Sequence, residues 1–261
     1  MIFFYVLICF IWALYFPVIN HFVCHFLLTS PTTIRDFIYF QHNKYVVNNS
    51  LNINPSAKHI IVLVHGRYSC PVQFVDIQEK LLTTIDSQTT LFPVWMKNGS
   101  SSIRDDGQSL YNQLSDYFGR QIHRELTIIG ISKGGVTACY ALILNDPIFS
   151  VRKIITLSSP LKGTKLADWS FCSVTRQELS YQSQFLISLE KRLKKLLEKN
   201  NNVKIYHIVP QWDHIIIPVE ASFYNHTPST MILKYQGWAG HVGIQYDPVV
   251  INQINQWVHE G

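Results

Sequence analysis

The sequence is poor in charge and in cysteine, and each shortage excludes something. Only 15% of the 261 residues are Asp, Glu, Lys or Arg, which is low for a soluble protein, whereas 47% are hydrophobic and supply a large core. The cysteines are too few and too scattered for a disulfide framework or a metal site: Cys9, Cys24, Cys70, Cys139 and Cys172. We therefore expect neither a metal nor an organic cofactor.

The net charge of +5 is modest, and the basic residues do not alternate with aromatic ones along one face, so no nucleic-acid partner is expected. One basic cluster lies on a predicted helix that also carries an apolar stripe: Lys191, Arg192, Lys194, Lys195 and Lys199. Two interpretations stay open for this cluster. It is either the solvated face of a packed helix or a contact for anionic lipid headgroups.

No charged residue occurs from Ile2 to Leu28, and a helix of about 20 residues spans a bilayer core. A secretory signal would normally begin with basic residues and end in a small-x-small cleavage site, and neither is evident here. We therefore expect residues 1–30 to form a hydrophobic N-terminal helix, retained as a single-pass membrane anchor. An atypical cleaved signal and a buried or peripheral helix are the alternatives, and the flanking charges do not indicate which side of the membrane the domain occupies.

Residues 31–58 form a polar lead-in, and strand and helix patterns alternate over residues 59–261. The predicted strands are Ile60–Val64, Leu91–Met96, Leu126–Ile131, Val151–Leu157, Val203–Val209 and Met231–Tyr235. The predicted helices are Pro71–Ile85, Ile103–Phe118, Val136–Leu144, Tyr181–Lys199 and Pro248–Val258. This alternation predicts an α/β domain with a mainly parallel sheet and helices on both faces.

The segment Gly130-Ile131-Ser132-Lys133-Gly134 lies between a predicted strand and a predicted helix. It matches G-x-S-x-G, the nucleophile elbow, in which a sharp turn presents the serine hydroxyl at the end of a strand. The pattern predicts that Ser132 is an acyl nucleophile and that the backbone N–H of Lys133 faces the oxyanion. The Lys133 side chain has no explanation in the sequence.

Upstream, Val62-Leu63-Val64-His65-Gly66-Arg67 ends an earlier predicted strand in a His-Gly turn. With this turn and the elbow, the chain resembles the lipase and esterase branch of the α/β-hydrolase superfamily. The resemblance implies the α/β-hydrolase fold and a second oxyanion donor in the amide of Arg67, the residue after the His-Gly pair. Those lipases often continue as H-G-x-x-G, whereas Ser69 takes the last position here. His65 itself fits a structural role.

Two later segments extend the resemblance, which covers roughly Ile60 to Val258. The loop after the strand Val203–Val209 is similar to the D-x-x-V-x-P turn of the family, which makes Asp213 the triad acid. Gly240-His241-Val242-Gly243 resembles the family's G-H-x-G segment, which makes His241 the base. Asp247 is expected to cap the helix that opens at Pro248.

The stretch Leu157–Thr164 resembles the G-S-P-x-x-G-T segment of lipases and leads into residues 165–181, which form either a connecting loop or a small cap over an acyl pocket. Together these features predict a membrane-anchored serine hydrolase that cleaves carboxylic esters, of lipids or other acyl chains, through an acyl-enzyme on Ser132. A thioesterase, amidase or acyltransferase could use the same triad. A non-catalytic protein of this fold, binding lipid or a partner, is the alternative from a different class.

Overall fold

The computed structural model describes residues 52–67, 69–96, 101–169, 173–199, 202–225 and 229–260. The predicted anchor at residues 1–30 and the larger part of the lead-in lie outside these ranges. Among the residues that are described, no helix is both long and apolar enough to cross a membrane.

Six parallel strands form one sheet in the order β2-β1-β3-β4-β5-β6. They are β1 (His59–Val64), β2 (Thr89–Val94), β3 (Arg124–Ile131), β4 (Phe149–Leu157), β5 (Lys204–Pro210) and β6 (Thr230–Tyr235). The expectation of a mainly parallel sheet is therefore confirmed. Because the strands all point the same way, the loops that follow them gather at one edge of the sheet.

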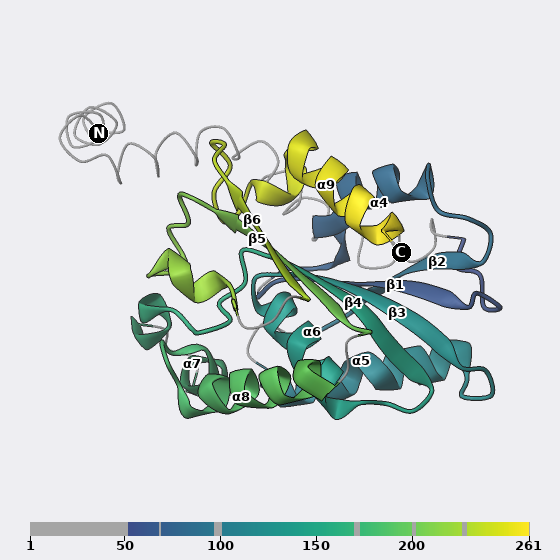
Figure 1. Cartoon of the computed structure of the whole chain (residues 1–261), viewed down its shortest axis with the longest axis horizontal. Helices are drawn as coiled ribbons and strands as arrows, with labels where there is room; N and C mark the ends of the chain where they lie inside the picture. Colours follow the sequence, from purple (N-terminus) through teal and green to yellow (C-terminus); the bar gives the residue numbers. More distant parts are fainter. Residues whose placement is uncertain are drawn as a thin grey trace, which may run out of the picture.

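The helices cover both faces of the sheet. They are α4 (Val75–Leu82), α5 (Ile103–Phe118), α6 (Lys133–Leu144), α7 (Ser173–Leu179), α8 (Gln184–Lys199) and α9 (Pro248–His259), with 3-10 turns η1 (Pro71–Phe74), η2 (Lys165–Trp169), η3 (Val219–Ser222) and η4 (Ile244–Tyr246). Figure 1 shows α4 and α9 on one face and α5, α6 and α8 on the other.

The two faces form two separate hydrophobic cores, and β1 shows how the sequence builds both. Ile60, Val62 and Val64 pack into the core under α5, α6 and α8, whereas Ile61 and Leu63 pack into the core under α4 and α9. Successive side chains of a strand point to opposite faces, so a continuous apolar run is the pattern that a strand buried on both faces requires.

Four helices begin or end at residues other than those expected, and α9 differs by one residue, ending at His259 rather than Val258. The segment from Pro71 opens with the turn η1 before α4, and α8 starts at Gln184 rather than Tyr181. The helix after the elbow begins three residues early, at Lys133. It includes Gly134, where a Cβ atom would lie 2.0 Å from the carbonyl oxygen of Val64. Close packing against β1 therefore requires glycine in this first turn.

Candidate active site

The loop between β3 and α6 holds Ser132 in a sharp, strained turn. Its φ of 54° and ψ of −123° fall in a region that residues other than glycine rarely adopt, at a cost of about 1–3 kcal/mol. At Gly130 a Cβ atom would lie 2.5 Å from the carbonyl of Gly134, so the turn cannot accept a larger residue there. The Ser132 amide donates to the Leu157 carbonyl at the end of β4, 2.8 Å away, and fixes the turn to the sheet. These contacts hold Ser132 at the loop edge of the sheet.

Three side chains from separate loops form a continuous hydrogen-bond chain at this edge. The Nε2 atom of His241 lies 3.0 Å from the Ser132 hydroxyl. Its Nδ1 atom lies 2.9 Å and 3.1 Å from the two carboxylate oxygens of Asp213. Asp213 and His241 are each only 8% exposed. The arrangement places a base against the serine and a carboxylate against the base, as a Ser-His-Asp triad does.

The carboxylate of Asp213 is itself oriented by the loop that follows it. The backbone amides of Ile215 and Ile216 both donate to its Oδ1 atom at 2.8 Å. This Asx-type turn restricts the rotation of the carboxylate and aims it at His241. Asp247, the other acidic residue near the histidine loop, accepts from the Val249 amide at 2.8 Å and caps α9, as expected.

The His-Gly turn after β1 lies directly against Ser132. A Cβ atom on Gly66 would lie 3.3 Å from the Ser132 Cβ atom, so a larger residue would press on the serine. The Gly66 amide donates to the Gln73 side-chain oxygen at 2.9 Å. Both residues predicted to donate an amide to the oxyanion are therefore next to this contact in the chain. Arg67 follows Gly66, and Lys133 follows Ser132. Gln73 supports this turn, and no motif in the sequence singles it out.

His65 is engaged in the structure of the turn rather than in the hydrogen-bond chain of Ser132. Its Nε2 atom accepts from the Met96 amide at 3.1 Å, so its Nδ1 atom carries the proton and donates to the Gly66 carbonyl at 2.9 Å. Burial lowers the pKa of His65, which favours the neutral ring that this pair of bonds needs. The contacts agree with the structural role expected for it.

The side chain of Lys133, the residue after Ser132, forms a buried ion pair. Its ammonium lies 2.8 Å from the Asp106 carboxylate, and the two side chains are 4% and 2% exposed. The ammonium also donates to the carbonyl of Ser101, and the Ser101 hydroxyl donates to Asp106. Lys133 thus joins the elbow to the first turn of α5, a contact that its sequence position did not indicate.

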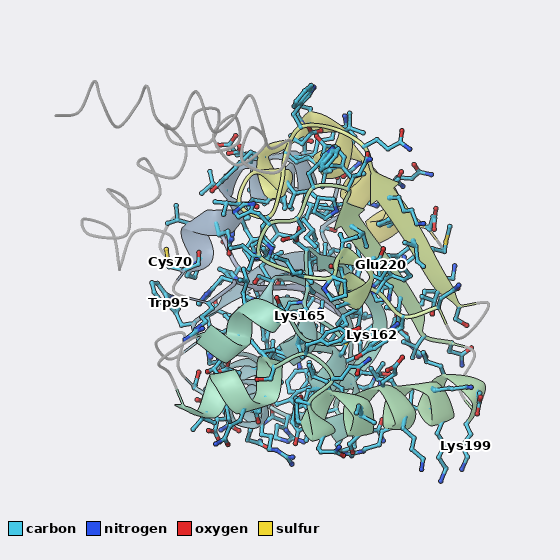
Figure 2. The ribbon with its side chains drawn as sticks, turned by 90° about the vertical axis from the view of Figure 1, so that its left-hand side faces the viewer. Cys70, Trp95, Lys162, Lys165, Lys199 and Glu220 are labelled. Carbon is cyan, nitrogen blue, oxygen red and sulfur yellow. The ribbon has the colours of Figure 1, made fainter. Side chains whose placement is uncertain are left out.

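The insertion at residues 165–181 is hydrogen-bonded to two other segments near Ser132, through Thr164 just before it and through Thr175 of α7. At its start, the Thr164 hydroxyl donates to the Ile215 carbonyl at 2.6 Å, in the loop that carries Asp213. In α7, the Thr175 hydroxyl donates to the Ser101 carbonyl at 3.0 Å, and this carbonyl also accepts from the Lys133 ammonium. Figure 2 shows this end of the molecule, with Lys165 between Trp95 and Glu220 in that view.

Helix α7 of the insertion also meets the start of α5 through a buried carboxylate. The Oε2 atom of Glu178 accepts from the Ile103 amide at 2.5 Å, and its Oε1 atom lies 3.7 Å from Arg104. Burial raises the pKa of Glu178. The expected alternatives for the insertion were a loop or a cap, and the structure shows a helical segment bridging the Asp213 loop and α5.

Solved structures with the same arrangement of strands and helices identify the fold. The product of the gene lin2722 from Listeria innocua is 13% identical, with a TM-score of 0.58, over 78% of this chain and 95% of that one. Aspergillus fumigatus lipase B is 14% identical, with a TM-score of 0.55, over 84% of this chain and 58% of that one. Est1E from Butyrivibrio proteoclasticus is 12% identical, with a TM-score of 0.56, over 80% and 90%.

The chain has the α/β-hydrolase fold. No protein-family model matches its sequence, and no curated protein sequence matches it either. In the α/β-hydrolase fold the loops after the strands carry the functional residues, and here β3, β5 and β6 are followed by the loops of Ser132, Asp213 and His241. In the described part of the chain, no group of three or more His, Cys, Asp or Glu side chains is arranged to hold a metal ion.

Large apolar side chains are exposed on the loops that carry Asp213 and His241. Trp212, Ile215 and Ile217 flank Asp213 and are 41%, 36% and 41% exposed. Trp238, three residues before His241, is 71% exposed, and Leu166 in the insertion is 38% exposed. Exposed apolar groups mark a surface for an apolar ligand or an interface when they form a contiguous patch.

Proposed function

We propose that the protein is a serine hydrolase that cleaves carboxylic esters through an acyl-enzyme on Ser132. The observation that carries the proposal is the hydrogen-bond chain from Ser132 through His241 to Asp213 at a strained nucleophile elbow. In a hydrolase of this fold, that chain is the device that turns a serine hydroxyl into a nucleophile.

The proposed reaction uses each contact of this hydrogen-bond chain. The Ser132 hydroxyl attacks the acyl carbon while its proton passes to Nε2 of His241, 3.0 Å away. Asp213 stabilises the resulting imidazolium through Nδ1. His241 then protonates the leaving alcohol as the ester C–O bond breaks, leaving the acyl group on Ser132. Water, deprotonated by His241, attacks the acyl-enzyme and releases the carboxylic acid.

The backbone amides of Arg67 and Lys133 are proposed to bind the oxyanion of the tetrahedral intermediates. Support comes from the contact of Gly66 with Ser132 and from the position of Lys133 at the first turn of α6. The first amides of a helix have no partner within it and point toward developing negative charge. Each such donor contributes about 3 kcal/mol to the transition state on the usual mutational scale.

The proposed substrates are esters of lipids or other acyl chains. The exposed apolar residues on the loops of Asp213 and His241 support this class, because an acyl chain needs apolar surface beside the scissile bond. Aspergillus fumigatus lipase B, whose structure is similar, is named a lipase. The charge-free stretch from Ile2 to Leu28 is proposed as a single-pass anchor, which would hold the domain beside such substrates.

A fluorophosphonate probe, which labels activated serines, tests the enzymatic proposal. The full chain in detergent should be labelled, Ser132→Ala should not, and the exposed Ser87→Ala should be labelled like the wild type. Equal labelling of the wild type and Ser132→Ala would overturn the proposal in favour of a non-catalytic protein. A panel of p-nitrophenyl esters and the matching thioesters and anilides then identifies the bond that is cleaved, with esters expected to react fastest.

A further inference from the structure

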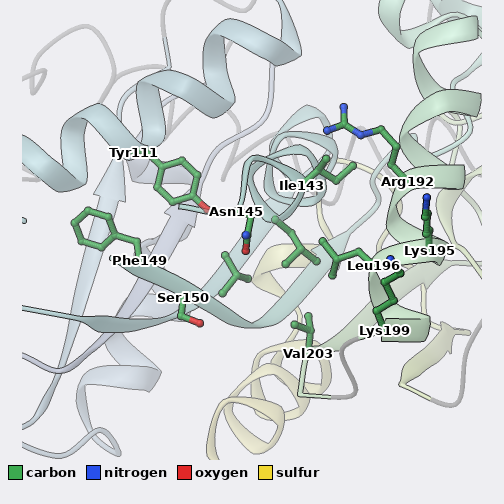
Figure 3. A pocket seen from close by; sticks show the side chains of 12 residues that line it. Tyr111, Ile143, Asn145, Phe149, Ser150, Arg192, Lys195, Leu196, Lys199 and Val203 are labelled. Atoms are coloured by element: carbon green, nitrogen blue, oxygen red, sulfur yellow. The ribbon is translucent and has the colours of Figure 1, made fainter. Parts of the chain in front are cut away.

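A groove opens at the end of the molecule opposite Ser132. Its cavity is about 560 Å³, and Figure 3 shows the side chains around it. They come from the end of α6, the start of β4, the C-terminal half of α8, the residue before β5 and, with Tyr111, from α5.

The groove is separate from the candidate active site. It lies at the first residues of β4, whereas Ser132 follows the last residue of β3, which pairs with the last residue of β4. The nine residues of β4 therefore separate the two, roughly 26 Å at about 3.3 Å per residue. Neither Ser132, Asp213 nor His241 lines the groove.

Three cations line one side of the groove. Arg192, Lys195 and Lys199 occupy positions i, i+3 and i+7 of α8, so they share one face of that helix. Within the described residues none of the three is joined in an ion pair, and Glu190 and Glu198 of the same helix do not line the groove. The groove thus concentrates positive charge without a carboxylate among its lining residues.

The rest of the lining complements a polar anion attached to an organic group. In Figure 3 the Ser150 and Asn145 side chains lie across the groove from Arg192, Lys195 and Lys199, and Asn145 ends α6 in the left-handed conformation at φ 53°. Ile143 and Leu196 add half-buried apolar surface between them. The hydroxyl of Tyr111 is committed to the Ala141 carbonyl at 2.9 Å and is not needed for a ligand.

Asp146, the acidic residue that follows Asn145, is already paired with a cation. Its two carboxylate oxygens bind the Arg120 guanidinium at 3.0 Å and 3.1 Å, and one of them also accepts from the Ile148 amide. It therefore does not compete for the cations of α8. Positive charge, a hydroxyl and an amide suit phosphate oxygens, which take charge-assisted hydrogen bonds from Arg and Lys.

We propose that this groove binds a phosphate ester, with the phosphate against Arg192, Lys195 and Lys199 and its organic group on Ile143 and Leu196. The ester is either the headgroup of an anionic phospholipid or a soluble metabolite, and the experiment separates the two sources. The proposal does not depend on the hydrolase activity, because the groove shares no residue with the hydrogen-bond chain of Ser132.

The test uses the full chain carrying Ser132→Ala, so that no substrate is consumed. Calorimetry with glycerol 3-phosphate measures soluble binding, and co-sedimentation compares phosphatidylcholine vesicles with and without phosphatidic acid, which cancels any contribution of the N-terminal segment. Lys195→Glu/Lys199→Glu should weaken the binding about tenfold or more. Lys58→Glu/Lys80→Glu changes the net charge equally outside the groove and should leave the binding within about twofold.

Each outcome decides the proposal. Binding of glycerol 3-phosphate that the α8 variant weakens supports a soluble ester. A preference for phosphatidic acid vesicles alone, weakened by the same variant, supports a lipid headgroup. Absence of both kinds of binding overturns the proposal, as does equal weakening by the two variants. If the Glu variant does not fold, Lys195→Gln/Lys199→Gln replaces it in the same comparison.

Discussion

The buried ion pair between Lys133 and Asp106 provides a sharp test of how the elbow is supported. Lys133→Met keeps the backbone amide beside Ser132 and most of the side-chain volume, but it removes the ammonium. The Asp106 carboxylate, 2% exposed, would then be buried without its counter-charge. Removing one partner of a buried pair costs about 3–5 kcal/mol, a large share of the roughly 5–15 kcal/mol that holds a domain folded.

Urea unfolding followed by tryptophan fluorescence measures this loss, with Lys58→Met as a control. Lys58 is exposed, so its substitution should change the free energy of unfolding by no more than about 0.5 kcal/mol. The double variant Lys133→Met/Asp106→Leu removes both charges and should recover much of the loss, because an apolar pair of similar size avoids the cost of burying ions. The recovery distinguishes a charge effect from a packing effect.

The same variants report on the proposed chemistry. Lys133→Met frees the Ser101 carbonyl, which Thr175 of α7 also binds, so the elbow and the insertion lose a shared contact. We expect the rate of fluorophosphonate labelling to fall in Lys133→Met and to stay low in the double variant, which removes the unpaired carboxylate but does not restore the contact with Ser101. If Lys133→Met changed the free energy of unfolding by less than about 1 kcal/mol, the assigned ion pair would be refuted, because an unpaired buried carboxylate lowers stability by about 3–5 kcal/mol.

Four further predictions follow from the site and the N-terminal segment. Asp213→Asn should lower kcat for an ester substrate by about 10⁴-fold while stability changes little, since the amide favours the wrong tautomer of the histidine; a loss below tenfold would count against Asp213 as the acid. Gly134→Ala should prevent the native elbow from forming, because its methyl group would meet the Val64 carbonyl, and soluble yield with probe labelling checks this. Burial lowers the pKa of His65 from 6.5 in the folded protein, so the neutral ring contributes its full stabilisation above pH 6.5. This stabilisation is lost as the pH falls through the folded-state pKa, and His65→Asn should flatten that part of the profile of urea midpoint against pH. Full-length protein should stay in the membrane fraction after a carbonate wash and removal of residues 1–30 should release it, whereas release of the full-length chain would remove the anchor proposal.

The hydrogen bonds of the insertion connect it to the residues around Ser132. Thr164 binds the Asp213 loop, and Thr175 and Lys133 bind the same carbonyl of Ser101. A displacement of α7 would therefore act on Ser101 and through it on the lysine next to Ser132. This path consists of hydrogen bonds between named atoms, which makes the double variant above a direct test of it.

The sequence by itself determined the order of strands and helices, the parallel sheet and the elbow. These features depend on neighbours in the chain: the alternation of Ile60–Val64 between two cores, and the glycines at 130 and 134 that a turn at φ 54° requires. Short motifs after two predicted strands also predicted Asp213 and His241. Their distances to Ser132 depend on the sheet, which brings the three loops together. The membrane anchor at residues 1–30 stays a prediction that rests on composition.

Only the tertiary structure decided what the remaining polar side chains do. The role of the Lys133 side chain could not be predicted from the sequence, because its partner, Asp106, lies on another helix. An ion pair between two helices depends on how α5 packs against α6. The hydrogen bond of Gln73 to Gly66 likewise depends on packing between separate segments. So does the groove, where the cations of α8 lie beside the end of α6 and the start of β4. Local turns are dictated by adjacent residues, whereas contacts between distant segments exist only once the cores have set the helices against the sheet.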